Sequence, residues 1–162
     1  LFPIVFMLHE FEEIIGFKTW VIKDGLWIAK KYPKVAKQIS IYERLSVPAF
    51  ALAVLEEFIL IGIVTALALT LQWYSVWIAV FLGFSLHIFI HIGQWMMVRK
   101  YIPIIITSLL SLPYIFGGTH KIFSEFSLSM IITCFVIGTI VLIVNLRFVH
   151  KLALRYDKIR KK

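Results

Sequence analysis

Charged residues and cysteine are scarce in this 162-residue chain. Only 16% of its residues are charged and 60% are hydrophobic, whereas soluble domains contain about 25% charged residues and roughly 45–50% apolar ones. The single cysteine, Cys134, excludes a disulfide framework and a cysteine-rich metal site. The composition therefore predicts an integral membrane protein, and the length leaves room for one helical membrane domain.

Long apolar runs predict an all-α, polytopic membrane protein with about five transmembrane helices, because each span needs ~20 mostly apolar residues. The predicted spans, within a single domain covering 1–162, are about residues 1–22, 47–71, 76–98, 102–116 and 126–148. The fourth run is short and contains Pro103 and Pro113, which predict a kink. Between the first two spans, residues 18–44 are Lys-rich and amphipathic, which predicts a cytoplasmic surface helix interrupted at Pro33.

Acidic residues are also few, nine against 17 basic ones. Seven of the basic residues lie in 18–44, two are Arg99 and Lys100, and seven lie from Arg147 onward, so that only Lys121 lies elsewhere. Because Lys and Arg gather in cytoplasmic loops, this pattern predicts a protein of the cytoplasmic (inner) membrane with its basic tail, residues 149–162, in the cytoplasm and its N-terminal end outside. Contact with membrane lipids accounts for the net charge of +8, and no nucleic-acid partner is predicted.

Ionisable side chains inside the predicted spans point to a functional site, since each costs roughly 2.5–3.5 kcal/mol on insertion scales. They come from three spans and are His9, Glu12, Glu13, Glu56, Glu57, His87 and His91. Counted at ~1.5 Å per residue from the cytoplasmic ends of their helices, all of them lie roughly 8–18 Å deep. Three helices are therefore predicted to bring carboxylates and imidazoles to one layer of the membrane.

Imidazole and carboxylate side chains favour Zn, Fe or Mn, and Glu and His on facing helices build di-iron and di-manganese sites. A divalent metal would also offset the buried carboxylate charge. The predicted ligands are His9, Glu13, Glu57, His87 and His91. Glu12 and Glu56 are predicted as catalytic general bases on a metal-bound water, or as further ligands. The choice within each Glu-Glu pair stays open.

The motif His9-Glu10-Phe11-Glu12-Glu13 resembles the one that names the HXXEE-domain family of small polytopic bacterial membrane proteins. The likeness extends through Glu56-Glu57 and through His87-Ile-Phe-Ile-His91 to Arg99-Lys100-Tyr101-Ile102-Pro103. It implies a helical membrane protein of largely uncharacterised function, and so it bears on the fold more than on the activity.

A weaker likeness is to the CAAX-protease-like intramembrane endopeptidases, which use a Glu-Glu-x-x-x-Arg motif. Here Phe17 stands at the Arg position after Glu12-Glu13, and Ile61 stands there after Glu56-Glu57. The missing arginine counts against an endopeptidase of this type, which stays an alternative.

The leading functional hypothesis is a membrane metalloenzyme that acts on a lipid or other apolar substrate. Metal-activated water would hydrolyse the substrate, or an iron centre would oxidise it. The alternative of a different class is a non-enzyme: a proton- or cation-coupled transporter, or a membrane accessory or immunity subunit that engages a protein partner.

Overall fold

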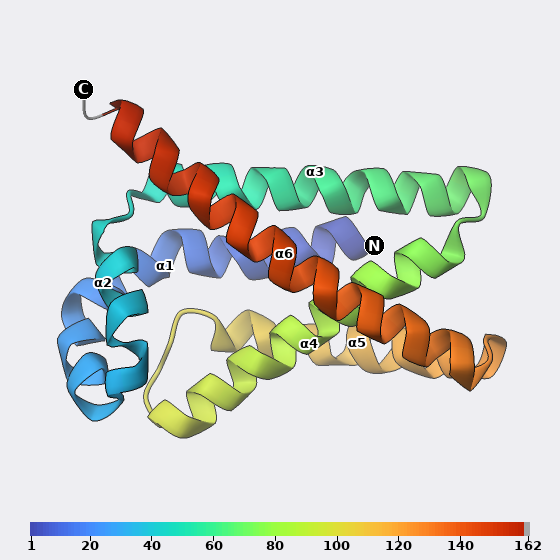
Figure 1. Cartoon of the computed structure of the whole chain (residues 1–162). Coiled ribbons are helices and arrows are strands. Elements are labelled where there is room, and N and C mark those ends of the chain that lie inside the picture. Colours follow the sequence, from blue (N-terminus) through green and yellow to red (C-terminus); the bar gives the residue numbers. More distant parts are fainter. Residues whose placement is uncertain (161–162) are drawn as a thin grey trace.

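A computed structural model describes residues 1–160, and over that range the chain is all-α, as predicted (Figure 1). A short 3-10 turn, η1 (Pro33–Val35), joins the first two helices. The α-helices are α1 (Phe2–Lys31), α2 (Ala36–Arg44), α3 (Val47–Leu71), α4 (Tyr74–Val98), α5 (Ile105–Glu125) and α6 (Leu128–Arg160).

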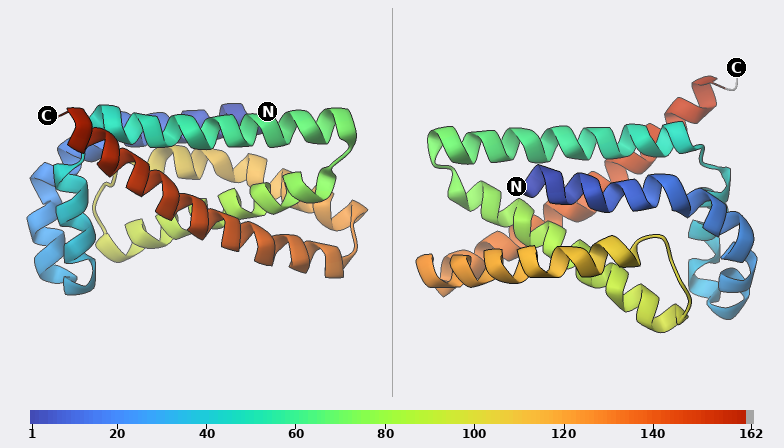
Figure 2. Two further views of the ribbon diagram at one scale, coloured as in Figure 1. Left: turned by 45° about the horizontal axis from the view of Figure 1, so that its top comes forward. Right: turned by 180° about the vertical axis from the view of Figure 1, so that it is seen from behind.

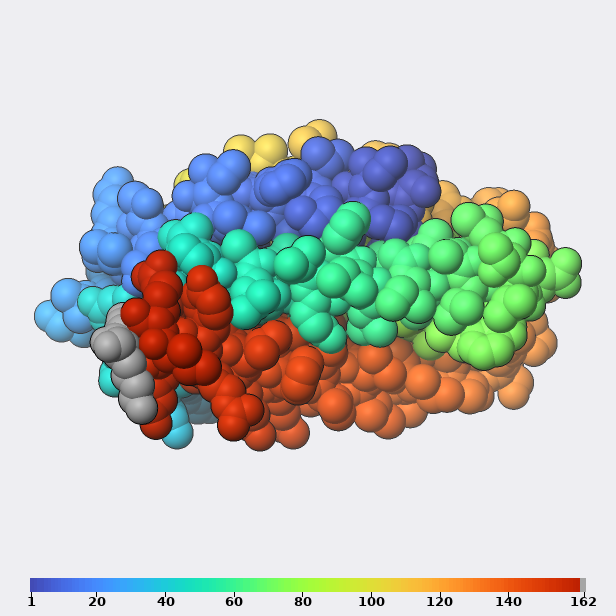
Figure 3. Space-filling model, turned by 90° about the horizontal axis from the view of Figure 1, so that it is seen from above, coloured from blue at the N-terminus to red at the C-terminus, as the bar shows by residue number. Residues whose placement is uncertain are grey.

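The five long helices form a bundle in which α1 lies beside α3 and α6 crosses the others diagonally (Figures 1 and 2). The α3–α4 and α5–α6 turns lie at one end. At the opposite end lie α2, the α4–α5 loop and the last turns of α6. We call this second end the basic end, because residues 18–44, Arg99, Lys100 and the basic part of α6 all lie there. From above, α1, α3 and α6 form neighbouring bands across one face (Figure 3).

Three of the helices, α3, α4 and α6, are long and apolar enough to cross a membrane. Each of the first two has 25 residues and is therefore about 37 Å long, against a hydrocarbon core of about 30 Å. Only 17% of the most apolar stretch of α6 is buried inside the protein, so most of that stretch faces outward. The prediction of five spans is not confirmed for α1, which carries three glutamates close together, or for α5, which is less apolar.

Several helices extend beyond the predicted span boundaries. α1 continues to Lys31 and includes the first part of the predicted surface segment, α5 continues through Pro113 to Glu125, and α6 continues through the basic tail to Arg160. Residues 117–125, which lie between the predicted spans 102–116 and 126–148, are helical. The reason is physical: an apolar run ends where the surroundings become polar, whereas helical hydrogen bonding continues past that point.

Small residues allow α4 and α6 to cross closely. A Cβ on Gly83 would lie 2.9 Å from the carbonyl oxygen of Gly138, and a Cβ on Gly138 would overlap the carbonyl of Ala79. Such small residues let the backbones of membrane helices approach one another. This crossing sets the position of α4, which carries two of the predicted metal ligands.

The basic end is held together by Asp157 on α6. The carboxylate of Asp157 accepts hydrogen bonds from the backbone N–H (2.8 Å) and the hydroxyl (2.5 Å) of Ser46, and the Ser46 hydroxyl oxygen accepts one from the N–H of Ala49 at the start of α3. This capping arrangement ties the end of α6 to the junction of α2 and α3.

Candidate metal centre

Four of the five predicted ligands lie together between α1 and α4. His9 and Glu13 are four residues apart on α1, and His87 and His91 are four residues apart on α4, so each pair lies on one face of its helix. One ligand atom from each of the four lies within 4.8 Å of the others. His9 is fully buried and the side chains of Glu13 and His91 are nearly so.

The distances within this group of four fit a single metal ion. Nε2 of His91 lies 3.0 Å from Oε1 of Glu13 and 2.7 Å from Nε2 of His87, and Nε2 of His9 lies 3.7 Å from the same glutamate oxygen. Tetrahedral zinc with ligands at about 2.0–2.1 Å would place its ligand atoms roughly 3.3–3.4 Å apart. These three separations bracket that value, and all four ligand atoms lie within 4.8 Å of one another.

Hydrogen bonds determine which ring nitrogen of His9 carries the proton. The Thr107 hydroxyl donates to Oε2 of Glu12 at 2.5 Å, so its oxygen accepts from Nδ1–H of His9 at 3.1 Å. The Nε2 atom of neutral His9 is therefore a bare lone pair, and it is buried without a hydrogen-bond partner. Imidazoles that bind metals are held in this way, with one nitrogen donating to the protein and the other free for the ion.

His91 is held in the same way. Its Nδ1 lies 3.1 Å from Oε1 of Gln94, an acceptor, so that in the neutral ring Nδ1 carries the proton and Nε2 presents a lone pair to Glu13. A lone pair and a carboxylate oxygen 3.0 Å apart repel unless a cation or a proton lies between them. Both histidines thus present the donor atoms that a divalent ion requires.

Glu12, predicted as a catalytic base, lies outside this group. Its carboxylate accepts hydrogen bonds from the backbone N–H groups of Thr107 (2.8 Å) and Ile106 (3.4 Å) and from the Tyr101 hydroxyl (3.1 Å). These are the unsatisfied N–H groups at the start of α5, where a negative charge also complements the helix dipole. Desolvation, and then the hydrogen bond to Glu12, raise the pKa of Tyr101.

Glu56, the second predicted base, also lies outside the group of four. It accepts a hydrogen bond from Nδ2 of Asn145 at 3.1 Å, which links α3 to α6. Asn145 is a polar residue near the inner end of the predicted span 126–148, and that position was the signal for such a contact.

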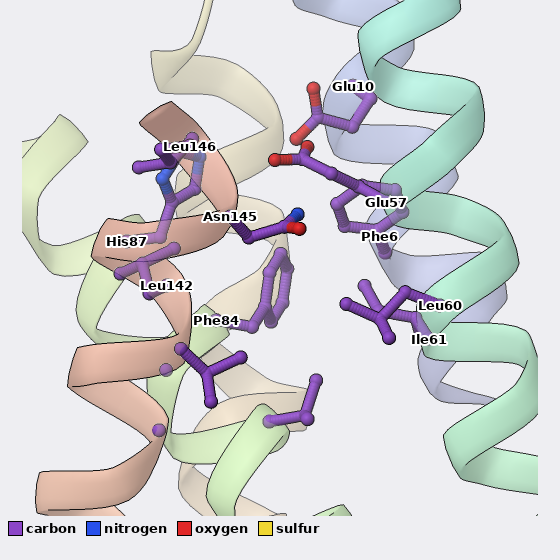
Figure 4. Close-up of a pocket in the computed structure, with 14 residues that line it drawn as sticks. Phe6, Glu10, Glu57, Leu60, Ile61, Phe84, His87, Leu142, Asn145 and Leu146 are labelled. Carbon is purple, nitrogen blue, oxygen red and sulfur yellow. The ribbon is translucent and has the colours of Figure 1, made fainter. Parts of the chain in front are cut away.

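Glu57, the fifth predicted ligand, does not join the group of four but lines a cavity of about 230 Å³ beside it. Glu10 lines the same cavity, is 4% exposed, and was not predicted as a site residue. Figure 4 shows both carboxylates pointing into a second, adjoining pocket, which His87 and Asn145 line from the other side. The spacing of Glu10 and Glu13, three residues apart, was the signal that could have placed Glu10 near the site.

The wall of the cavity toward the basic end includes Tyr42 of α2 and His150 of α6. The Tyr42 hydroxyl donates to Nε2 of His150 at 2.9 Å, because Nδ1–H of His150 is used by the carbonyl of Leu146. Burial, and then the charges of Glu13 and Glu57, raise the pKa of Tyr42 to about 12. Tyr42 therefore stays a neutral donor, and no sequence pattern pointed to its role.

An all-α bundle with three apolar helices and a buried His/Glu group defines a helical membrane-type protein with a candidate metal centre. The chain belongs to the HXXEE family: the family model, described as a protein of unknown function with HXXEE motif, matches residues 1–117. The matched range includes all four grouped residues, Glu12 and Thr107. Comparisons with curated proteins and with solved structures find no match.

Proposed function

We propose that the chain is a protein of the cytoplasmic membrane, with α1, α3, α4, α5 and α6 as its five spans and the basic end in the cytoplasm. Support comes from the outward-facing apolar surface of α3 and α6 and from the packing of α1 and α5 beside the three apolar helices. The gathering of basic side chains at one end supports the orientation.

The proposed activity is that of a membrane metalloenzyme acting on a lipid or other apolar substrate, with the metal held by His9, Glu13, His87 and His91. The observation that carries this proposal is the lone pair of His9 Nε2, fully buried and unpaired among three other donor atoms within 4.8 Å. An unpaired buried polar atom costs about 1–3 kcal/mol, and a bound cation removes that cost.

The cavity beside the group of four provides room for a reaction. A divalent ion activates water for hydrolysis or, if it is iron, supports oxidation. Glu57 and Glu10 face the cavity next to His87 and are the proposed acceptors for a proton released from water. The rest of the lining is largely apolar, including Phe50, Val54 and Leu142, which suits an apolar substrate.

Elemental analysis of protein purified without chelator tests the metal site. We expect about one equivalent of a transition metal per chain, less than a tenth of that in His9→Gln, and an unchanged content in His120→Gln, a matched change at an exposed position of α5. Less than a tenth of an equivalent in the wild type would refute the metal site.

The enzyme hypothesis is tested on metal-loaded protein in liposomes of bacterial lipid, with products followed by mass spectrometry. Glu57→Gln should retain the metal and lose turnover. Unchanged turnover in Glu57→Gln would exclude Glu57 as the proton acceptor. A lipid profile that stays the same with the wild-type protein would count against lipid chemistry.

A proton- or cation-coupled transporter is the second candidate, because Glu10 of α1 and Glu57 of α3 extend the ionisable side chains from His87 across the pocket. Proton flux into liposomes, measured with an entrapped dye, distinguishes the two. A flux that is present in the wild type and lost in Glu57→Gln, with no lipid product formed, would favour transport.

A further inference from the structure

A second hollow lies on the outside of the bundle at the basic end. It is a groove of about 510 Å³ between the last turns of α1, α2 and the end of α4, a volume within the ~300–1,000 Å³ of typical ligand sites. Figure 2 shows α2 folded back along the end of α1 there. The apolar walls come from Ile28, Val35, Ile39, Val98 and Ile102.

The polar side chains of the groove are mainly hydrogen-bond donors. Lys31 and Lys34 lie exposed at its edge, and no acidic residue lines it. The indole Nε1–H of Trp20, which also lines the groove, is buried and has no hydrogen-bond partner. Two ammonium groups beside an apolar wall are complementary to an anion that carries an apolar chain. The Lys31 ammonium also lies over the rings of Trp27 (4.8 Å) and Tyr32 (5.5 Å), whereas Trp20 lies about 16 Å farther along α1.

The groove and the inner cavity share a wall. Phe17, Tyr42 and Gln94 line both, and the rings of Phe17 and Tyr42 pack edge to face with their centroids 5.2 Å apart. Gln94 accepts the Nδ1–H of His91, a proposed metal ligand. One layer of side chains therefore separates the groove from the candidate metal centre.

We propose that this groove binds an anionic membrane lipid, with its phosphodiester at Lys31 and Lys34 and an acyl chain along the apolar wall. Lys and aromatic residues at a membrane surface favour such a ligand, since Lys can lay its stem on apolar surface and hold its charge at the headgroups. Anionic lipids attract basic residues by about 1 kcal/mol per residue. The inference rests on the proposed function in one respect, namely that the bound lipid would be the substrate of the enzyme. Lipid binding itself needs no metal.

Lipid binding is measured on the full chain in detergent by native mass spectrometry, with phosphatidylglycerol and phosphatidylcholine of the same acyl chains. We expect clear preference for phosphatidylglycerol and about 30-fold weaker binding in Lys31→Gln/Lys34→Gln. The matched control is Lys151→Gln/Lys158→Gln, which removes the same charge from exposed positions of α6 and should bind as the wild type does. Val35→Trp, which fills the groove without changing charge, should weaken binding by at least about tenfold.

Equal binding of the two lipids would overturn the proposal, because the groove would then not select an anionic headgroup. Equal losses in the two double variants would also overturn it, because the attraction would then come from net charge rather than from a groove. Retained binding in Val35→Trp would also overturn it. Metal content, measured on the same preparations, keeps the two proposals separate. A lipid preference in protein that binds no metal would support the groove and refute the metal site. A metal-loaded protein without a lipid preference would support the metal site and refute the groove.

Discussion

Replacing Thr107 with valine should weaken metal binding without touching any ligand atom. The Thr107 hydroxyl accepts the Nδ1–H of His9 and donates to Glu12. Valine keeps nearly the same shape but can do neither. The Nδ1–H of His9 then has no acceptor in a site where the residue is 0% exposed, and the imidazole loses the bond that keeps Nε2 unprotonated.

The size of the effect follows from the burial of His9. A buried donor left unpaired costs about 1–3 kcal/mol, and each 1.4 kcal/mol is a factor of about ten in affinity. The protein can recover part of this cost by turning the ring, so we expect a loss of about 10–100-fold, the range usual for residues that orient metal ligands. Thr107→Ser retains the hydroxyl and should stay within about threefold of the wild type.

Affinity is measured by competition between the protein and a chelator of known affinity, with Zn²⁺ or Co²⁺. Thr139→Val is the matched control, since the half-buried Thr139 hydroxyl donates to a carbonyl of its own helix, that of Phe135. Thr107→Val that binds metal as tightly as Thr139→Val would refute the proposed role of the Glu12–Thr107–His9 chain. A loss in Thr107→Ser equal to that in Thr107→Val would refute it as well.

Two other predictions concern the helix crossing and the cavity wall. Gly138→Ala forces a Cβ against the carbonyl of Ala79 and should cost about 1–3 kcal/mol, lowering the thermal unfolding temperature. Gly62→Ala, whose Cβ meets nothing within 4 Å, should not lower it, and equal unfolding temperatures would contradict the close crossing. The pKa of Tyr42, raised from 10.0 to about 12, means that stabilisation by the neutral phenol is complete below pH 10 and lost between pH 10 and 12. Ultraviolet titration should therefore show a tyrosine step near pH 12 whose amplitude is smaller by about one tyrosine in Tyr42→Phe, and identical titrations above pH 11 would exclude this shift.

Hydropathy located the central helices well because apolarity and helicity coincide there. The predicted spans 47–71 and 76–98 correspond to α3 (Val47–Leu71) and α4 (Tyr74–Val98). The agreement fails at α5 and α6, which continue as helices where the sequence becomes polar. Hydropathy indicates whether a segment lies in apolar or polar surroundings, not whether it is helical. It therefore misses the polar ends of α5 and α6, which continue as helix to Glu125 and Arg160.

The candidate site was predictable to the extent that it depends on spacing within one helix. His9 with Glu13, and His87 with His91, each follow from four-residue spacing, and depth counting placed the two pairs at one level. Counting depth does not give the rotation of a helix about its axis, and neighbouring residues differ by about 100°. Tertiary packing sets that rotation for α3, and it turns Glu57 into the cavity rather than into the group of four.

The residues of the family motif have two separate structural roles, which are connected through Thr107. The first histidine and last glutamate of the motif, His9 and Glu13, belong to the group of four, whereas Glu12 between them caps α5. The cap accepts from two backbone N–H groups and two hydroxyls, which an ionised carboxylate with two oxygens can satisfy and a glutamine, with one acceptor atom, cannot. The Thr107 hydroxyl also orients His9. The packing of α5 against α1 and the orientation of the His9 imidazole therefore both depend on the Glu12 carboxylate. That dependence is a physical reason for two adjacent glutamates in the motif.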